Sequence, residues 1–146
     1  MNCFETLEQE VSGWSGVSVH PHRFGGKEFR FGSAEIGHIH PGVVVDIPFP
    51  RSVRDALLAG GLAEEHRWVP NSGWITFRIR SEEDFKHALW LMRLSYLRYS
   101  LKTATDPRKL LEQEADELQL NSQFKSLLEP FVPKIASQVM AGPLRA

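Results

Sequence analysis

The stretch from Phe24 to Pro50 constrains the fold of this chain more than any other, and it reads FGGKEFRFGSAEIGHIHPGVVVDIPFP. Runs of β-branched and aromatic residues alternate there with Gly-Gly, Gly-Ser and Pro-Gly pairs, a pattern typical of short strands joined by tight turns. Because the turns are tight, we expect the strands to pair antiparallel. One strand carries a His-x-His pair, His38 and His40, and five of the six histidines fall between residues 20 and 66.

The remaining elements follow from apolar periodicity, capping residues and turn signals. They are, in order, a helix over 3–12, an alternating run at 17–20, a helix over 52–59, strands over 64–69 and 74–80, a long helix from Ser81, and helices at about 107–120 and 122–128. We therefore expect an α+β domain at 1–101, with a mostly antiparallel sheet of about five strands and helices packed on one face. Residues 102–146 are expected to form a C-terminal helical extension.

Composition and charge limit the class of protein and its partners. The chain has 146 residues, of which 42% are hydrophobic and 24% charged, as in an ordinary globular domain. A net charge of -1 does not favour nucleic acid or a membrane surface. Cys3 is the only cysteine, the amino terminus lacks a signal-peptide pattern, and no apolar run approaches the ~20 residues of a membrane span. We expect a cytoplasmic protein with a small-molecule ligand, and the C-terminal helices offer a surface for a homodimer.

Strict alternation divides the side chains of the strand over 35–40 between the two faces of the sheet. Ile36, His38 and His40 are expected on one face, and Glu35, Gly37 and Ile39 on the other. Two imidazoles on one face, roughly 6.5–7 Å apart, can converge on one ligand atom or one metal ion. The alternative is that both are polar residues of a solvated sheet face. A second pair, His20 and His22, flanks Pro21 and is expected in a polar turn.

His66 is the candidate third member of the histidine set. With His38 and His40 it would supply three imidazoles, the ligand count of an open catalytic zinc site. Their spacing matches no recognised zinc signature, so we expect no metal and keep these three residues as the alternative ligand set. His66 can equally be a surface residue within the charged run at 64–67.

Aromatic and polar residues around the next turn are the candidate ligand-binding residues. Trp68 and Trp74 flank the Pro-Asn-Ser-Gly turn and can form a wall for a planar molecule. Alternation places Thr76 and Arg78 on the same face as Trp74. Arg78 can hold a carboxylate or an enolate, although a solvated surface arginine is the alternative.

Four segments, read together, resemble the luciferase-domain family, which is named after the fungal luciferases and includes many small bacterial proteins. The segments are HRFGGKEFRFG, EIGHIHPGVVVDIPFP, HRWVPNSGWITFRIRSEED and HALWLMRLSYLRY, and they span about residues 14–101. The E-I-A-H-M-H stretch of the fungal pattern is matched by Glu35, Ile36, His38 and His40.

Further along the fungal pattern, a histidine precedes a W-T-F strand, and His66 and the residues 74–77 match it. The fungal enzymes oxidise a hydroxypyrone luciferin with molecular oxygen, release carbon dioxide and light, and have no established metal or organic cofactor. The resemblance implies that His38 or His40 is the base that forms an enolate. It also implies that Arg78 or His66 stabilises the negative charge, with oxygen as co-substrate and no other cofactor.

The leading hypothesis is a luciferase-like, cofactor-independent oxygenase that acts on a small enolisable or phenolic molecule. Its catalytic candidates are His38, His40, Glu35 and His66, and its substrate-binding candidates are Trp74, Thr76, Arg78 and Trp68. The alternative hypothesis is a non-catalytic module that binds a small molecule or another protein.

Overall fold

The computed structural model describes residues 2–134 of the chain. Two compact units divide the chain within its longest helix, one ending at Leu97 and the other beginning at Arg98. Residues 135–146 of the expected extension lie outside the described residues, and the expected domain boundary after residue 101 stays a prediction. Within 2–134, no helix combines the length and the apolar character needed to cross a bilayer.

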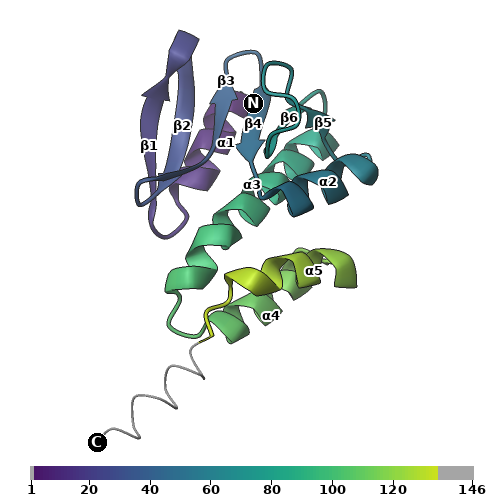
Figure 1. Cartoon of the computed structure of the whole chain (residues 1–146). Coiled ribbons are helices and arrows are strands. Elements are labelled where there is room, and N and C mark those ends of the chain that lie inside the picture. Colours follow the sequence, from purple (N-terminus) through teal and green to yellow (C-terminus); the bar gives the residue numbers. More distant parts are fainter. Residues whose placement is uncertain (1, 135–146) are drawn as a thin grey trace, which may run out of the picture. The chain divides into compact units, whose positions relative to one another are not determined.

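The first unit is built on an antiparallel sheet of six strands in the order β1-β2-β3-β4-β6-β5 (Figure 1). The strands are β1 (Val17–His22), β2 (Gly26–Phe31), β3 (Ala34–His40), β4 (Val44–Pro48), β5 (Glu64–Glu65) and β6 (Trp74–Arg78). The helices are α1 (Cys3–Ser12), α2 (Arg51–Ala59) and α3 (Glu82–Thr103), with a short 3-10 turn η1 (Arg23–Gly25). The expected α+β class is confirmed, with six strands in place of about five.

The first strand is longer than the sequence pattern suggested. β1 pairs with β2 over six residues, from Val17 opposite Phe31 to His22 opposite Gly26. Pro21 is tolerated inside β1 because this strand lies at the edge of the sheet, where its missing N–H needs no partner. The longer strand holds both His20 and His22, so our expectation that these two residues belong to a polar turn is wrong.

The strand expected over 64–69 is limited to two residues, and the chain from 66 to 73 is a loop. Two features of this loop oppose a continued strand. Pro70 has no N–H to donate to a neighbour, and Asn71 adopts a positive φ of 61°. The loop leaves the sheet after Glu65 and returns as β6 at Trp74.

A bulge in β3 changes which side chains share a face. The pairing of β2 with β3 shifts between Phe29 and Arg30, so that Ile36 is an extra residue in β3. Ile36 is completely buried. The reversed alternation places Glu35 against His38, at 2.6 Å between carboxylate and imidazole. The expected division, with Ile36 beside the histidines and Glu35 opposite them, is therefore wrong.

One face of the sheet carries the apolar core and lies against α1 and α3 (Figure 1). Its fully buried side chains include Phe29, Ile39, Val45, Ile47 and Ile75 from the strands, and Leu7, Val11, Leu91 and Met92 from the helices. Gly37 allows the close approach of α3, because its φ is 153° and a Cβ there would lie 2.7 Å from the Met92 sulfur. The expected helix-covered face is thus present.

Two side chains of α3 tie this helix to the rest of the first unit. The Tyr96 hydroxyl donates to the Ser15 carbonyl at 2.6 Å, and the Ser95 hydroxyl donates to the Pro48 carbonyl at 3.3 Å. The expected N-cap is confirmed, since the Ser81 hydroxyl accepts from the Asp84 N–H at 3.1 Å. The first unit therefore presents a fixed sheet whose other face is available for a site.

The second unit contains the end of α3, α4 (Pro107–Glu117), α5 (Ser122–Leu128) and a 3-10 turn η2 (Glu129–Phe131). Asp106 caps α4 and Asn121 caps α5, each through its side-chain oxygen. The buried apolar residues of this unit are Leu101, Leu111, Ala115, Phe124 and Leu128. The helices expected after residue 106 are therefore present in the described part of the chain.

Candidate functional site

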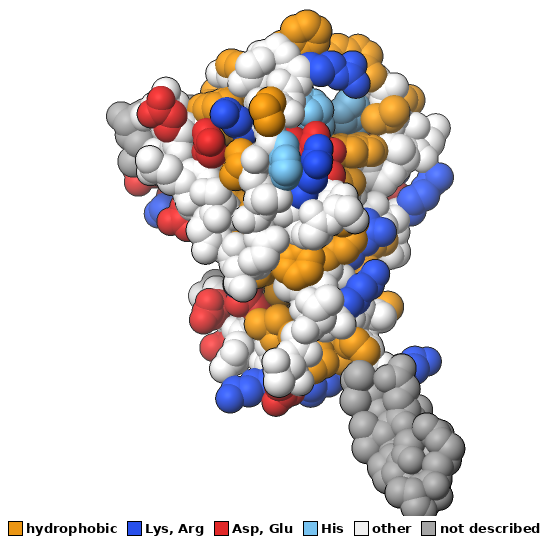
Figure 2. Space-filling model, turned by 90° about the vertical axis from the view of Figure 1, so that its left-hand side faces the viewer, with side chains coloured by type: hydrophobic (Ala, Val, Ile, Leu, Met, Phe, Trp, Pro, Cys, Tyr) orange, Lys and Arg blue, Asp and Glu red, His pale blue; other side chains and the backbone are white. Residues whose placement is uncertain are grey.

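The polar face of the sheet, opposite to the apolar core, carries an open cleft of about 930 Å³. Its lining residues alternate with core residues along each strand, as Asp46 does with Val45 and Ile47. Figure 2 shows histidine side chains gathered in a hollow of this surface, with acidic and basic side chains beside them. The cleft lies at the histidine-rich strand that the sequence singled out.

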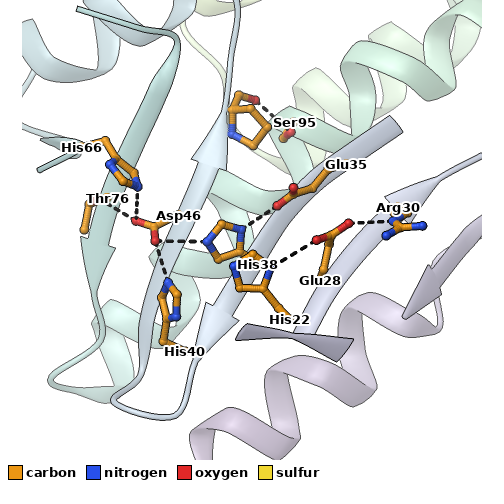
Figure 3. A network of polar contacts seen from close by, with 11 residues as sticks. His22, Glu28, Arg30, Glu35, His38, His40, Asp46, His66, Thr76 and Ser95 are labelled. Carbon is orange, nitrogen blue, oxygen red and sulfur yellow. Dashed lines mark hydrogen bonds and ion pairs between the residues drawn. The ribbon is translucent and has the colours of Figure 1, made fainter. Parts of the chain in front are cut away.

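Asp46 in β4 is the centre of the cluster and is only 4% exposed. Its Oδ1 accepts a hydrogen bond from the Thr76 hydroxyl at 2.7 Å and lies 3.5 Å from His66 Nε2. Its Oδ2 lies 2.8 Å from His40 Nε2 and 3.2 Å from His38 Nε2. One buried carboxylate thus contacts three imidazoles and a hydroxyl, as Figure 3 shows.

The pairing of strands explains why these side chains meet at Asp46. In the registers of β4 with its two neighbours, Asp46 lies opposite His38 on one side and opposite Thr76 on the other. Side chains of directly paired residues stand about 4.5–5.5 Å apart on the same face. His40 is two residues from His38 and shares its face, and His66 reaches the cluster from the loop after β5.

His38 is held between two carboxylates. Its Nδ1 lies 2.6 Å from Glu35, and its Nε2 lies 3.2 Å from Asp46. Burial disfavours the charged imidazolium, but the hydrogen bonds to Asp46 and Glu35 outweigh that effect and raise the pKa of His38 to about 9. At neutral pH both ring nitrogens therefore carry protons and donate to carboxylates.

The pKa of Asp46 moves in the opposite direction. Burial alone would raise it, but hydrogen bonds from His38, Thr76 and His40 hold the pKa of this carboxyl well below its usual range. Asp46 therefore stays ionised across the physiological range, and its negative charge is balanced from within the cluster.

His22 joins the cluster from the edge strand β1. Its ring stacks on that of His38, with centroids 3.9 Å apart and planes inclined by 20°. Its Nδ1 lies 3.2 Å from Glu28, which also accepts a hydrogen bond from Arg30 at 2.7 Å. Figure 3 shows Glu28, between His22 and Arg30, beside the group of residues around Asp46.

His66 is fixed in one neutral tautomer by its own loop. The Trp68 backbone N–H donates to His66 Nδ1 at 3.2 Å, so the proton of the neutral ring lies on Nε2, which faces Asp46. In this form His66 is a hydrogen-bond donor to Asp46. It cannot also accept a proton from a substrate at Nε2.

The aromatic residues occupy two different positions. Trp74 is half-buried, and its ring lies 5.5 Å from that of His38 and 6.0 Å from that of His66. Trp68 is 71% exposed at the rim, with the Arg67 guanidinium 4.5 Å from its ring centroid. Arg78 also lines the cleft and is exposed.

The structure therefore brings the predicted residues together on one surface. Glu35, His38, His40, His66, Trp74 and Thr76 lie in or against the cluster, and Trp68 and Arg78 lie at the rim of the cleft. Their catalytic and binding roles stay predictions.

The sequence did not predict three members of the cluster, which are Asp46, Glu28 and His22. A signal for Asp46 was present, because an aspartate inside the β-branched run at 43–47 is buried at a cost unless it has partners. The other two meet only through the pairing of β1 with β2, which no local pattern reveals.

The residues that could hold a metal differ from the predicted set. His22, His38 and His40 each offer a ring nitrogen, and these atoms all lie within 4.8 Å of one another. His66 faces the opposite oxygen of Asp46 and is not in this group. The ligand set expected from the sequence had His66 where the structure places His22.

Chemically, the cluster can exchange protons, bind an anion or bind a cation. His40 offers a ring nitrogen backed by a carboxylate, which is the usual arrangement of a general base. The protonated His38 and the rim arginines favour a negatively charged or hydroxylated planar molecule. The same imidazoles, when neutral, are ligands for a transition metal.

Comparison with known proteins bears on one segment of the chain. A family model described as "Luciferase domain" matches residues 33–95, which contain β3, β4 and β6 and the residues Glu35, His38, His40, Asp46 and His66. His22 and Glu28 lie before the matched segment. Neither the curated proteins nor the solved structures gave a match to this chain. The resemblance read from the sequence is thus confirmed over residues 33–95, where this segment is similar to the luciferase-domain family.

Proposed function

We propose that this protein is an enzyme that acts on a small enolisable or phenolic molecule in the histidine cleft, as a luciferase-like oxygenase. The observation that carries the proposal is the buried carboxylate of Asp46, against which the rings of His38 and His40 both lie. Replacing a buried ionic group with apolar residues often leaves stability unchanged or raises it by about 1–4 kcal/mol. A chemical role therefore accounts for this cluster better than a structural role does.

His40 is the base in this proposal. Its Nε2 is hydrogen-bonded to Asp46 at 2.8 Å, so the tautomer with a proton on Nε2 leaves the lone pair on Nδ1. Nδ1 takes the proton from the substrate, and Asp46 stabilises the imidazolium that forms. His38 is less suited to this step, because carboxylates already engage both of its nitrogens.

The product of this step is an enolate or phenolate, whose negative charge lies near the His38 imidazolium. The rings of His38 and His40 have centroids 4.9 Å apart, so the base and the cation face the same molecule. The electron-rich carbon of the anion then forms a carbon–oxygen bond with molecular oxygen, which is reduced to a peroxide. Oxygen is the only co-substrate that this scheme requires.

The aromatic residues and Arg78 complete the binding site. Trp74 packs beside His38 and His66 and offers a face for a planar ring, and Trp68 can cover that ring from the rim. Arg78 pairs with Val44 at the end of the cleft and supplies a cation for a carboxylate or a ring oxygen. The proposed ligand is therefore a small, planar, acidic molecule.

A second candidate is a non-catalytic module that binds such a molecule without converting it. The observation that favours it is that ring nitrogens of the cluster already have hydrogen-bond partners. His38 donates from both nitrogens, and His66 is locked as a donor to Asp46. A cluster with few open positions recognises a ligand by shape and charge but has little capacity to move protons.

Oxygen uptake with simultaneous photon counting separates the two candidates, with a 3-hydroxypyrone luciferin as the first substrate. The variants are His40→Ala and the control His20→Ala, whose ring contacts Ser18 in β1 and not Asp46. The enzyme proposal predicts uptake that falls by about 10²-fold or more in His40→Ala and persists in His20→Ala. Equal uptake in both variants would contradict it, and saturable ligand binding without uptake would favour the binding module.

A further inference from the structure

Three histidines from two strands converge on one point of the polar face. His22 comes from β1, and His38 and His40 come from β3. One nitrogen of each ring lies within 4.8 Å of the others, and the ring centroids are 3.9, 4.9 and 5.7 Å apart. Figure 3 shows the three imidazoles side by side next to Asp46.

The convergence depends on a glycine in the strand between them. β2 separates β1 from β3, and its residue opposite His22 is Gly26. A Cβ at Gly26 would lie 2.9 Å from the Ile39 carbonyl oxygen and 3.4 Å from the His22 Cβ. The absence of a side chain at this position lets a histidine of β1 approach those of β3 across the end of β2.

Carboxylates behind the rings orient two of the three histidines. Nδ1 of His22 faces Glu28 at 3.2 Å, and Nδ1 of His38 faces Glu35 at 2.6 Å. A metal-binding histidine commonly donates one ring N–H to a carboxylate, which fixes the ring and presents the other nitrogen to the ion. In His22 the nitrogen left for an ion is Nε2. In His38 it is also Nε2, which otherwise donates to Asp46 at 3.2 Å, so the ion takes the place of that proton.

The charges around the rings suit a divalent cation. Three carboxylates surround the histidines, and Arg30 pairs with that of Glu28. The carboxylates of Glu35 and Asp46 remain, and with neutral imidazoles they leave two negative charges in a largely buried cluster. One divalent ion balances these two charges.

We propose that His22, His38 and His40 form a binding site for a divalent first-row transition metal ion such as Zn²⁺. Imidazole nitrogens suit this class of ion, and three protein ligands leave an open position. Glu28 and Glu35 position the rings of His22 and His38, and Asp46 lies beside the ion as a fourth, acidic neighbour. The open position faces the cleft, where a hydroxyl or carboxylate of a ligand can reach the ion.

The metal site stands on the geometry of these residues and does not rest on the enzymatic proposal. The two proposals assign different tasks to His40, which is a base in one and an ion ligand in the other. Metal binding measured without any substrate therefore tests this inference separately from the oxygenase reaction.

The experiment uses the whole chain without a histidine tag, treated with a chelator and then loaded with Zn²⁺ or Co²⁺. Metal content after gel filtration gives the stoichiometry, competition with a chelator gives Kd, and the visible absorption of bound Co²⁺ reports the ligands. The informative variants are His22→Ala and Glu28→Gln, with His20→Ala as the matched histidine control. Circular dichroism establishes that each variant is folded.

We expect one ion per chain in the unmodified protein and in the His20→Ala control. His22→Ala should weaken binding by about 100-fold and change the Co²⁺ spectrum, while Glu28→Gln, which keeps all three ligands, should weaken it by about 10–100-fold. Glu28→Gln also keeps the inference testable if His22→Ala fails to fold. Fewer than about 0.1 ion per chain after loading, or equal affinities in Glu28→Gln and His20→Ala, would overturn the proposal.

Discussion

The two faces of the sheet differ in what holds them together. The face against α1 and α3 is close-packed and apolar, with side chains such as Phe29 and Ile47 that are completely buried. The other face is held by hydrogen bonds and charges, with Asp46 at the centre and the rings of His22 and His38 stacked beside it. Apolar packing supplies most of the stability of a domain. The charged face adds less stability, and the proposed site lies on it.

The largest expected effect is on the packed face. Phe29→Ala removes a completely buried ring between the sheet and the helices, and we expect a loss of about 3–5 kcal/mol in the free energy of unfolding. Urea denaturation measures this loss. A change below about 1 kcal/mol, well under the range for a buried aromatic ring, would show that this face is not the main source of stability.

A smaller effect is expected at the centre of the charged face. Asp46→Asn keeps the size of the side chain but removes the charge that His38 and His40 contact, and we expect a loss of about 2–3 kcal/mol in the free energy of unfolding at pH 6.

The matched control is Asp116→Asn, an exposed aspartate in α4, which should stay within about 0.5 kcal/mol of the unmodified protein. Equal losses in the two variants would mean that the buried cluster contributes no more to stability than a surface carboxylate.

The stability of the metal-free protein should depend on pH through His38. Its pKa is raised from 6.5 to about 9 in the folded protein, so its contribution is fully present below pH 6.5 and is lost as the pH rises through 9. With allowance for solvent screening, we expect a loss of about 2 kcal/mol across this range.

Urea denaturation at pH 6 and pH 9.5, in the presence of a chelator, measures this loss. Glu35→Gln removes one of the two carboxylates that raise the pKa of His38, so the loss should be smaller in that variant. A flat profile from pH 6 to 9.5 would contradict the assignment of a charged His38.

Asp46 contributes to the pH dependence at the acidic end of the scale. Its lowered pKa adds stability above about pH 4, and this stability is lost as the pH falls.

The smallest effect on stability is expected at the rim. Trp68 is 71% exposed, so Trp68→Ala should change the free energy of unfolding by less than about 0.5 kcal/mol. It should nevertheless weaken binding of a 3-hydroxypyrone by a few-fold, because the ring of the ligand would lose one of the aromatic side chains that it packs against. Fluorescence titration beside Trp74→Ala measures both contributions. Unchanged affinity in both variants would mean that neither tryptophan contributes to ligand binding.

The sequence predicted the fold well because most of its elements are encoded locally. The hairpins from Gly26 to Pro48 follow from glycine turns and alternation, and the long helix follows from the Ser81 cap and its apolar residues. The expected strand over 64–69 was wrong beyond Glu65, and Pro70, directly after this range, was the nearest local sign that a strand ends there.

The site was predicted only in part, because its remaining members depend on pairing between distant residues. His38 and His40 lie two apart in one strand, so their shared face is a local property. Glu35 joined them only through the bulge at Ile36, which arises from the register with β2. His22 joined them through its place opposite Gly26. The alternation of side chains within one strand does not predict how that strand pairs with its neighbours, so neither of these contacts could be predicted from it.

The central claim is that the histidines of the polar face form a binding site. Long-range ¹H–¹⁵N spectra of the imidazole rings test it most directly, recorded while Zn²⁺ and then a 3-hydroxypyrone are added to the chelator-treated protein. We expect the signals of His22, His38 and His40 to shift at one equivalent. The signals of His20 and of His87, which contacts the Leu62 carbonyl and Trp90, should stay in place. Unchanged signals for His22, His38 and His40 with both additions, or equal shifts in all six histidines, would contradict it.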